Sequence, residues 1–96
     1  MNKIEEIVRV LSNLKDQKLM KKFFESILTP NEINDISSRW ELVKLLDQGC
    51  SQREIAKKLN LSLCKITRGS KELSKKHSAF KKCIDLLKEL KKADNK

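Results

Sequence analysis

Basic side chains gather in the segment from Cys50 to Lys76, where they could bind phosphate groups. This segment holds eight Lys/Arg and two Asp/Glu, a net charge of +6, whereas residues 1–49 have no net charge and residues 77–96 carry +3. A local excess of cations is typical of a surface that faces a nucleic acid. The alternative is a solvated face that only keeps a small protein soluble.

The same segment has the pattern of a helix-turn-helix over about residues 51–73. Ser51 and Glu54 have the spacing of a capping box, and Ser62 can cap a second helix that begins at Leu63. Two short helices at a fixed angle need apolar side chains between them and a small residue where they cross. Ala56 is the small residue, and the inward side chains are Ile55, Leu59, Leu61 and Ile66.

The second helix of this pair would lie in the major groove of double-stranded DNA. Its first residues reach base edges, whereas Arg53 and the lysines mostly contact phosphate. The predicted DNA-binding residues are Gln52, Arg53, Lys57, Lys58, Leu63, Cys64, Lys65, Thr67 and Lys71. Helical hairpins of purely structural function share part of this pattern, so a structural helical dimer or protein-interaction module is an alternative.

The sequence shows no arrangement of residues that is typical of catalysis or of metal binding. The three cysteines are widely spaced without a CxxC pair, and His77 is the only histidine. This pattern predicts no zinc site, no disulfide framework, no cofactor and no enzymatic activity, and free cysteines favour a reducing cytoplasm. The N-terminal segment lacks the apolar run of a signal peptide, and no segment is long enough to span a membrane.

Six amphipathic helices are expected to position these side chains in one all-α domain, residues 1–96. Two lie in the first quarter, a third begins at Thr29 and Pro30 within LTPNE, and Gly49 can end it in a left-handed conformation. Asn60 can form the turn of the helix pair, and Ser78 can cap the last helix. The apolar face expected for the third helix is Ile33, Ile36, Trp40, Val43 and Leu46.

Six such helices have more apolar surface than a monomer of this length can bury. We therefore expect a homodimer, formed by helices within residues 1–48 and 78–92.

The segments LTPNE, SRWELVKLLDQG, SQREIAKKLN and ITRGSKEL resemble the tryptophan repressor family over roughly Leu28 to Leu73. The resemblance implies an intertwined homodimer that binds a palindromic operator with L-tryptophan as corepressor. It implies control of genes for tryptophan biosynthesis or salvage. An alternative is a helix-turn-helix regulator of the same fold that responds to a different ligand or to none.

The resemblance also assigns ligand-binding residues. Arg39 and Arg68 match the two arginines that flank the indole, and Arg68 would also bind the ligand carboxylate, with Thr29 near the same end. The backbone around Leu28 would accept hydrogen bonds from the ligand ammonium, and Gly69 would leave room for the indole. The corepressor-binding residues implied in this way are Leu28, Thr29, Arg39, Arg68, Gly69 and Glu72.

The chain departs from the family pattern at three places. Glu72 stands where the family has a serine close to the ligand ammonium, and this carboxylate could pair with the ammonium or alter the choice of ligand. The turn after Gly49 is one residue shorter. Ala56 replaces a lysine that faces the DNA in the family, so phosphate contacts are expected to move to Lys57 or Lys58.

Overall fold

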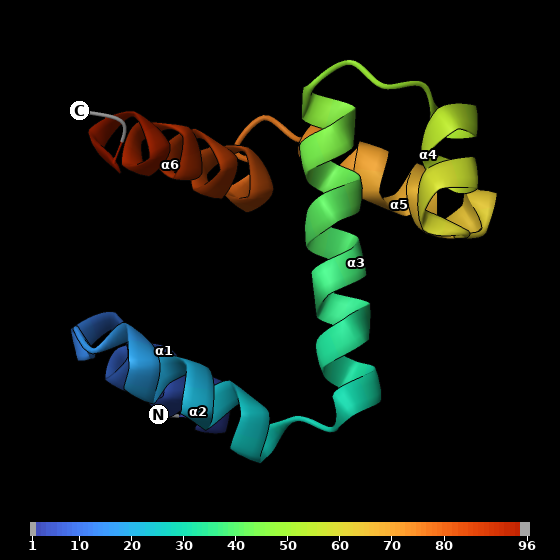
Figure 1. The fold of residues 1–96 in the computed structure, drawn as a ribbon. Coiled ribbons are helices and arrows are strands. Elements are labelled where there is room, and N and C mark those ends of the chain that lie inside the picture. Colours follow the sequence, from blue (N-terminus) through green and yellow to red (C-terminus); the bar gives the residue numbers. More distant parts are fainter. Residues whose placement is uncertain (1, 95–96) are drawn as a thin grey trace. The chain divides into compact units, whose positions relative to one another are not determined.

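The computed structural model describes residues 2–94, which form six α-helices and no strand (Figure 1). Met1, Asn95 and Lys96 of the predicted 1–96 domain lie outside the described residues. The helices are α1 (Lys3–Asn13), α2 (Gln17–Ile27), α3 (Pro30–Asp47), α4 (Gln52–Leu59), α5 (Leu63–Leu73) and α6 (Ala79–Asp94). The predicted all-α fold of six helices is confirmed.

The predicted capping box opens α3. The backbone N–H of Glu32 donates to Thr29 Oγ1 at 3.1 Å, and the Thr29 N–H donates to Glu32 Oε1 at 2.8 Å. Hydrogen bonds with Thr29 lower the pKa of the Glu32 carboxyl, and the bond with the Thr29 backbone has a larger effect than the bond with its side chain. Pro30 occupies the first helical position, where its missing N–H costs nothing.

Side chains also cap the later helices as expected. Ser51 Oγ accepts from the Glu54 N–H at 3.1 Å, Ser62 Oγ accepts from the Lys65 N–H at 3.4 Å, and Ser78 Oγ accepts from the Lys81 N–H at 3.1 Å. Each bond satisfies a backbone donor that the helix itself leaves unpaired.

A residue with positive φ follows each of the helices α3 and α4. Gly49 has φ +92°, and Asn60 has φ 52° and ψ 47° in the left-handed region. Both conformations were expected, because glycine and asparagine adopt them at the lowest cost.

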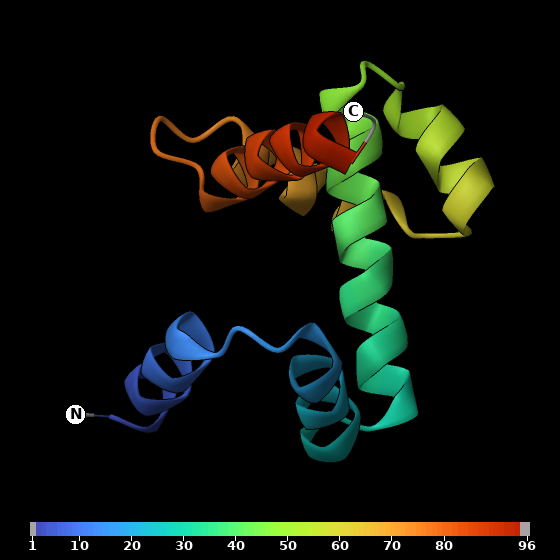
Figure 2. The same cartoon turned by 60° about the vertical axis from the view of Figure 1, so that its left-hand side comes forward.

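The chain divides into two compact units, residues 1–35 and 36–96. In the first unit α1 and α2 are joined by a short loop (Figure 2), and no described residue is buried. Phe23 and Phe24 meet edge to face with ring centroids 5.9 Å apart. The large apolar side chains exposed on this unit are Ile4, Val8, Val10, Leu19, Phe24 and Ile27.

The second unit has a buried core where the C-terminal half of α3 meets α4 and α5 (Figure 1). Its buried residues are Leu42, Leu45, Ile55 and Ile66, with Leu46, Leu59 and Leu61 packed around them. The predicted apolar face of α3 coincides only in part with the side of α3 that is buried within one chain. Val43 is buried and Leu46 borders the core, but Ile36 is 49% exposed, and the prediction omitted Leu42 and Leu45.

Gly69 is buried where α5 meets α3. A Cβ atom at this position would lie 3.0 Å from Leu42 Cδ2 and 3.4 Å from Leu42 Cγ. Leu42 is 2% exposed, and its side chain would have to shift to admit a Cβ atom at position 69. The glycine lowers helix propensity by about 1 kcal/mol relative to alanine, and the close approach of the two helices explains why it is nevertheless accommodated.

Asp47, at the end of α3, links this helix to α6. Its Oδ1 accepts from Lys81 Nζ at 2.8 Å and its Oδ2 from Lys88 Nζ at 2.7 Å, and the Asp47 side chain is only 8% exposed. Hydrogen bonds from Lys81 and Lys88 lower the pKa of the Asp47 carboxyl, and the same contact with Asp47 raises the pKa of Lys81. The pair of contacts fixes α6 to the second unit. Within the described residues, no helix has the length and hydropathy needed to cross a membrane.

Asp47→Asn should lower the melting temperature at pH 7 by a few degrees, because the amide cannot pair with two ammonium groups. A lowered carboxyl pKa stabilises the fold above the ordinary value of about 3.9 and loses this effect as the pH falls through the folded-state pKa. The difference between wild type and variant should therefore shrink as the pH falls toward the folded-state pKa of Asp47. Thermal melts monitored by circular dichroism between pH 7 and pH 3 measure it. Asp85→Asn, which changes the more exposed partner of Lys81, should have the smaller effect.

Gly69→Ala should destabilise the protein in the presence of Leu42, because overpacking costs about 1–3 kcal/mol and exceeds the gain in helix propensity. In a Leu42→Val background, which removes the δ-carbons, the same substitution should be neutral or stabilising. Urea unfolding of the four proteins at one concentration gives the coupling free energy. The same change in stability in both backgrounds would contradict the steric explanation.

Candidate functional site

Helices α4 and α5 form the predicted helix pair, joined by Asn60, Leu61 and Ser62. Ile55 and Ile66 are fully buried between the helices and α3, and Leu59 and Leu61 are half-buried beside them. The side chains predicted to face inward therefore do so. Because α4 and α5 share one core with α3, the outer faces of the pair are held in a fixed relation to each other.

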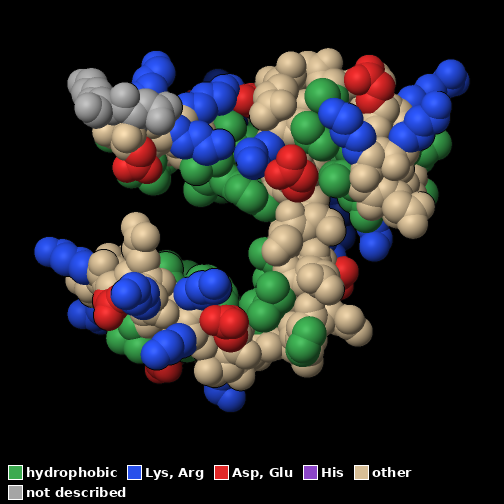
Figure 3. Space-filling view, in the orientation of Figure 1, with side chains coloured by type: hydrophobic (Ala, Val, Ile, Leu, Met, Phe, Trp, Pro, Cys, Tyr) green, Lys and Arg blue, Asp and Glu red, His purple; other side chains and the backbone are tan. Residues whose placement is uncertain are grey.

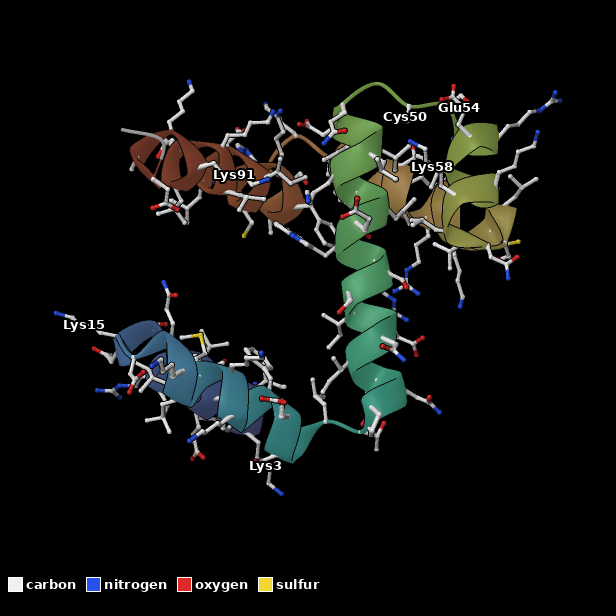
Figure 4. All side chains as sticks on the ribbon, in the orientation of Figure 1. Lys3, Lys15, Cys50, Glu54, Lys58 and Lys91 are labelled. Carbon is white, nitrogen blue, oxygen red and sulfur yellow. The ribbon has the colours of Figure 1, made fainter. Side chains whose placement is uncertain are left out.

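The nine side chains predicted to contact DNA are all exposed. Lys and Arg side chains are visible over the α4–α5 end of the unit and along α6 (Figure 3), and Figure 4 labels Glu54 and Lys58 on α4. Five exposed α5 side chains border a shallow depression: Leu63, Cys64, Thr67, Arg68 and Lys71. The pair thus presents cations and an apolar leading edge to solvent.

A cavity of about 490 Å³ lies on another side of α5. Its lining residues come from α3, α5 and α6: Arg39, Leu42, Val43, Lys65, Arg68, Gly69, Glu72 and Phe80. The structure therefore brings together four of the six residues that the resemblance assigned to the ligand. The cavity combines an apolar wall with three cations and one carboxylate, a composition that fits an aromatic molecule with charged groups.

Charge in the cavity is only partly compensated. Glu72 Oε1 accepts from Lys75 Nζ at 2.9 Å. Within the described residues, Arg39, Lys65 and Arg68 have no carboxylate within ion-pair distance. Three guanidinium or ammonium groups beside an apolar wall are suited to bind an anionic group, and a planar guanidinium can also stack on an aromatic ring.

Four lining residues were not predicted from the sequence to contact a ligand: Leu42, Val43, Lys65 and Phe80. Lys65 was assigned to DNA alone. Helical spacing could have found three of them, because residues three or four apart share a face. Leu42 and Val43 follow Arg39 at this spacing, and Lys65 precedes Arg68 and Gly69 in the same way. Phe80 has no such signal.

Leu28 and Thr29 belong to the first unit. The Leu28 N–H donates to the Phe24 carbonyl at 3.0 Å and ends α2, while Thr29 caps α3. Both residues therefore have a local structural function, and their contact with a ligand stays a prediction. Within residues 2–94, no cluster of His, Cys, Asp and Glu has the arrangement of a metal site.

Comparison with known proteins identifies the family. The model of the Trp repressor protein family matches residues 2–88. Proteins named Trp operon repressor homolog are similar to this chain in Chlamydia trachomatis (32% identity, 83% of this chain and 86% of the relative), Xylella fastidiosa (39%, 72% and 76%) and Vibrio parahaemolyticus (31%, 86% and 82%). No solved structure gives a significant match. The resemblance found in the sequence is confirmed, and the chain belongs to the Trp repressor family of transcriptional repressors.

Proposed function

We propose that the protein binds a palindromic operator as a homodimer, with L-tryptophan as corepressor, and controls genes for tryptophan biosynthesis or salvage. One observation carries this proposal. Helix α5 lines the cavity with Lys65, Arg68, Gly69 and Glu72. The same helix also presents exposed residues that could enter a major groove. A ligand in the cavity would therefore touch the helix that reads DNA.

L-Tryptophan matches the chemistry of this cavity. The indole ring would pack against Leu42, Val43 and Phe80, with the guanidinium groups of Arg39 and Arg68 against its faces. Arg68 would also hold the carboxylate, because guanidinium binds carboxylate with two parallel hydrogen bonds. Contact of the ligand with Thr29 and with the backbone at Leu28 stays a prediction of the family resemblance.

The ligand would favour DNA binding by limiting where α5 can lie against α3. Gly69 already allows α5 to contact Leu42 of α3 closely. A ligand in the cavity would add contacts to α5 about one helical turn before and one helical turn after Gly69. A ligand changes DNA affinity only if it binds the DNA-competent arrangement more tightly than other arrangements. Residues on α4 and at the start of α5 then contact phosphate and base edges, as the sequence predicted.

A second copy of the chain is proposed to cover the exposed apolar faces. No described residue of the first unit is buried, and on α6 Leu86 and Leu90 are each 54% exposed. Apolar faces of this extent mark protein interfaces. The proposed interface is therefore formed by helices within residues 1–48 and 78–92, the segments that the sequence also predicts for it.

Sedimentation equilibrium at micromolar concentration should give twice the chain mass of 11.2 kDa. Leu90→Glu, which places a charge in the proposed interface, should shift the protein toward the monomer and reduce its helix content. Lys91→Glu, on the neighbouring exposed position, should have a smaller effect. A stably folded monomer of the wild type would contradict the dimer.

Tryptophan and operator DNA should raise each other's affinity by the same factor, because linkage is reciprocal. A binding site selected from random DNA in the presence of L-tryptophan supplies the operator. Fluorescence anisotropy then measures operator affinity with and without L-tryptophan, and calorimetry measures tryptophan affinity with and without operator. We expect a factor of about 5–150. An operator affinity independent of tryptophan would instead favour a regulator of the same fold with another ligand or none.

Substitutions in α4 and α5 serve as controls in this experiment. Arg53→Ala and Lys58→Ala should weaken binding to all sequences and reduce the slope of affinity against salt by about one ion each. Thr67→Ala should change base preference. Equal losses on selected and random DNA for all three would support an incidental basic surface on a structural dimer.

A further inference from the structure

We propose that Glu72 makes the cavity selective for ligands that carry an ammonium group, so that it takes an aromatic amino acid in preference to the aromatic acid that lacks the amine. The inference rests on the proposed function and deepens it. It concerns which charged groups the ligand must have, and it can fail while tryptophan binding itself holds.

The charges of the cavity point to this requirement. Arg39, Lys65 and Arg68 alone would favour any aromatic carboxylate, because each is a cation without a carboxylate partner among the described residues. Glu72 is the single acidic side chain in the lining. The Glu72 side chain is 40% exposed, so it can meet a ligand at the mouth of the cavity, and a ligand ammonium can form a charge-assisted hydrogen bond with its carboxylate.

The position of Glu72 suits an α-amino acid. Arg68 and Glu72 are four residues apart on α5 and both border the cavity, so they lie on one face, about one helical turn apart. A carboxylate held by Arg68 would therefore leave the neighbouring ammonium of the same ligand within reach of Glu72. An α-amino acid carries the carboxylate and the ammonium on the same carbon atom, Cα.

Glu72 is available because its existing partner is weakly held. Only Oε1 accepts from Lys75, and within the described residues no hydrogen bond engages Oε2. The side chain of Lys75 is 63% exposed, and exposed ion pairs contribute little to stability. Glu72 does not pair with Arg68 instead, which agrees with the weaker interaction of a basic residue that precedes an acidic one by four positions in a helix.

Isothermal calorimetry with three ligands tests the proposal. L-Tryptophan carries both charged groups, indole-3-propionate lacks the ammonium, and tryptamine lacks the carboxylate. The wild type should bind L-tryptophan roughly tenfold or more tightly than indole-3-propionate, a ratio that one charge-assisted hydrogen bond can supply. In Glu72→Gln this preference should disappear or reverse, because the isosteric amide no longer attracts an ammonium or repels a carboxylate.

Two matched variants separate ammonium binding from other effects. Glu54→Gln makes the same chemical change on α4, outside the cavity lining, and should leave the ratio of affinities unchanged. Lys75→Gln removes the competing cation and should leave tryptophan binding intact or stronger. If Lys75→Gln lowers tryptophan affinity as much as Glu72→Gln does, Glu72 acts only by holding Lys75, and the proposal is overturned.

The remaining outcomes distinguish the ammonium requirement from the proposal that tryptophan is the corepressor. Equal binding of L-tryptophan and indole-3-propionate, unchanged by Glu72→Gln, overturns the ammonium requirement and leaves the corepressor proposal standing. Absence of binding by all three ligands overturns both. Circular dichroism of each variant confirms that an altered affinity does not reflect unfolding.

Discussion

The close contact between Gly69 of α5 and Leu42 of α3 sets the geometry on which the second unit depends. The Cβ atom of a side chain at position 69 would lie 3.0 Å from the buried Leu42 side chain, so either this leucine or α5 would have to shift. Leu42 also belongs to the core cluster with Ile55 and Ile66, and both Leu42 and Gly69 line the cavity. The packing of the helix pair and the cavity therefore meet at this contact.

Helix α5 serves three environments with three of its faces. Ile66 enters the core, Glu72 borders the cavity, and Thr67 and Lys71 face solvent, while Arg68 borders both the cavity and the exposed depression. A helix of this kind can connect a bound ligand to DNA without a long pathway between two separate sites. In the proposed corepression the ligand would contact the same helix that contacts DNA.

The two units differ in how far ion pairs between helices and buried apolar side chains stabilise them. In the second unit a small core is supplemented by the contacts of Asp47 with Lys81 and Lys88, which attach α6. In the first unit no described residue is buried, so its helices depend on capping and local spacing until another surface covers them. This difference is the physical basis for proposing a dimer.

The starts of α3, α4 and α5, the turns at Gly49 and Asn60 and the inward face of the helix pair could be predicted from the sequence, because these features depend on hydrogen bonds and spacing within a few residues. It also contained Arg39, Arg68 and Glu72 as ligand candidates through the family resemblance. Tertiary packing places Leu42 and Leu45 in the core and leaves Ile36 exposed within one chain, and it brings Lys65 and Phe80 to the cavity. Periodicity shows that a helix has an apolar stripe, but burial depends on which distant residues pack against it.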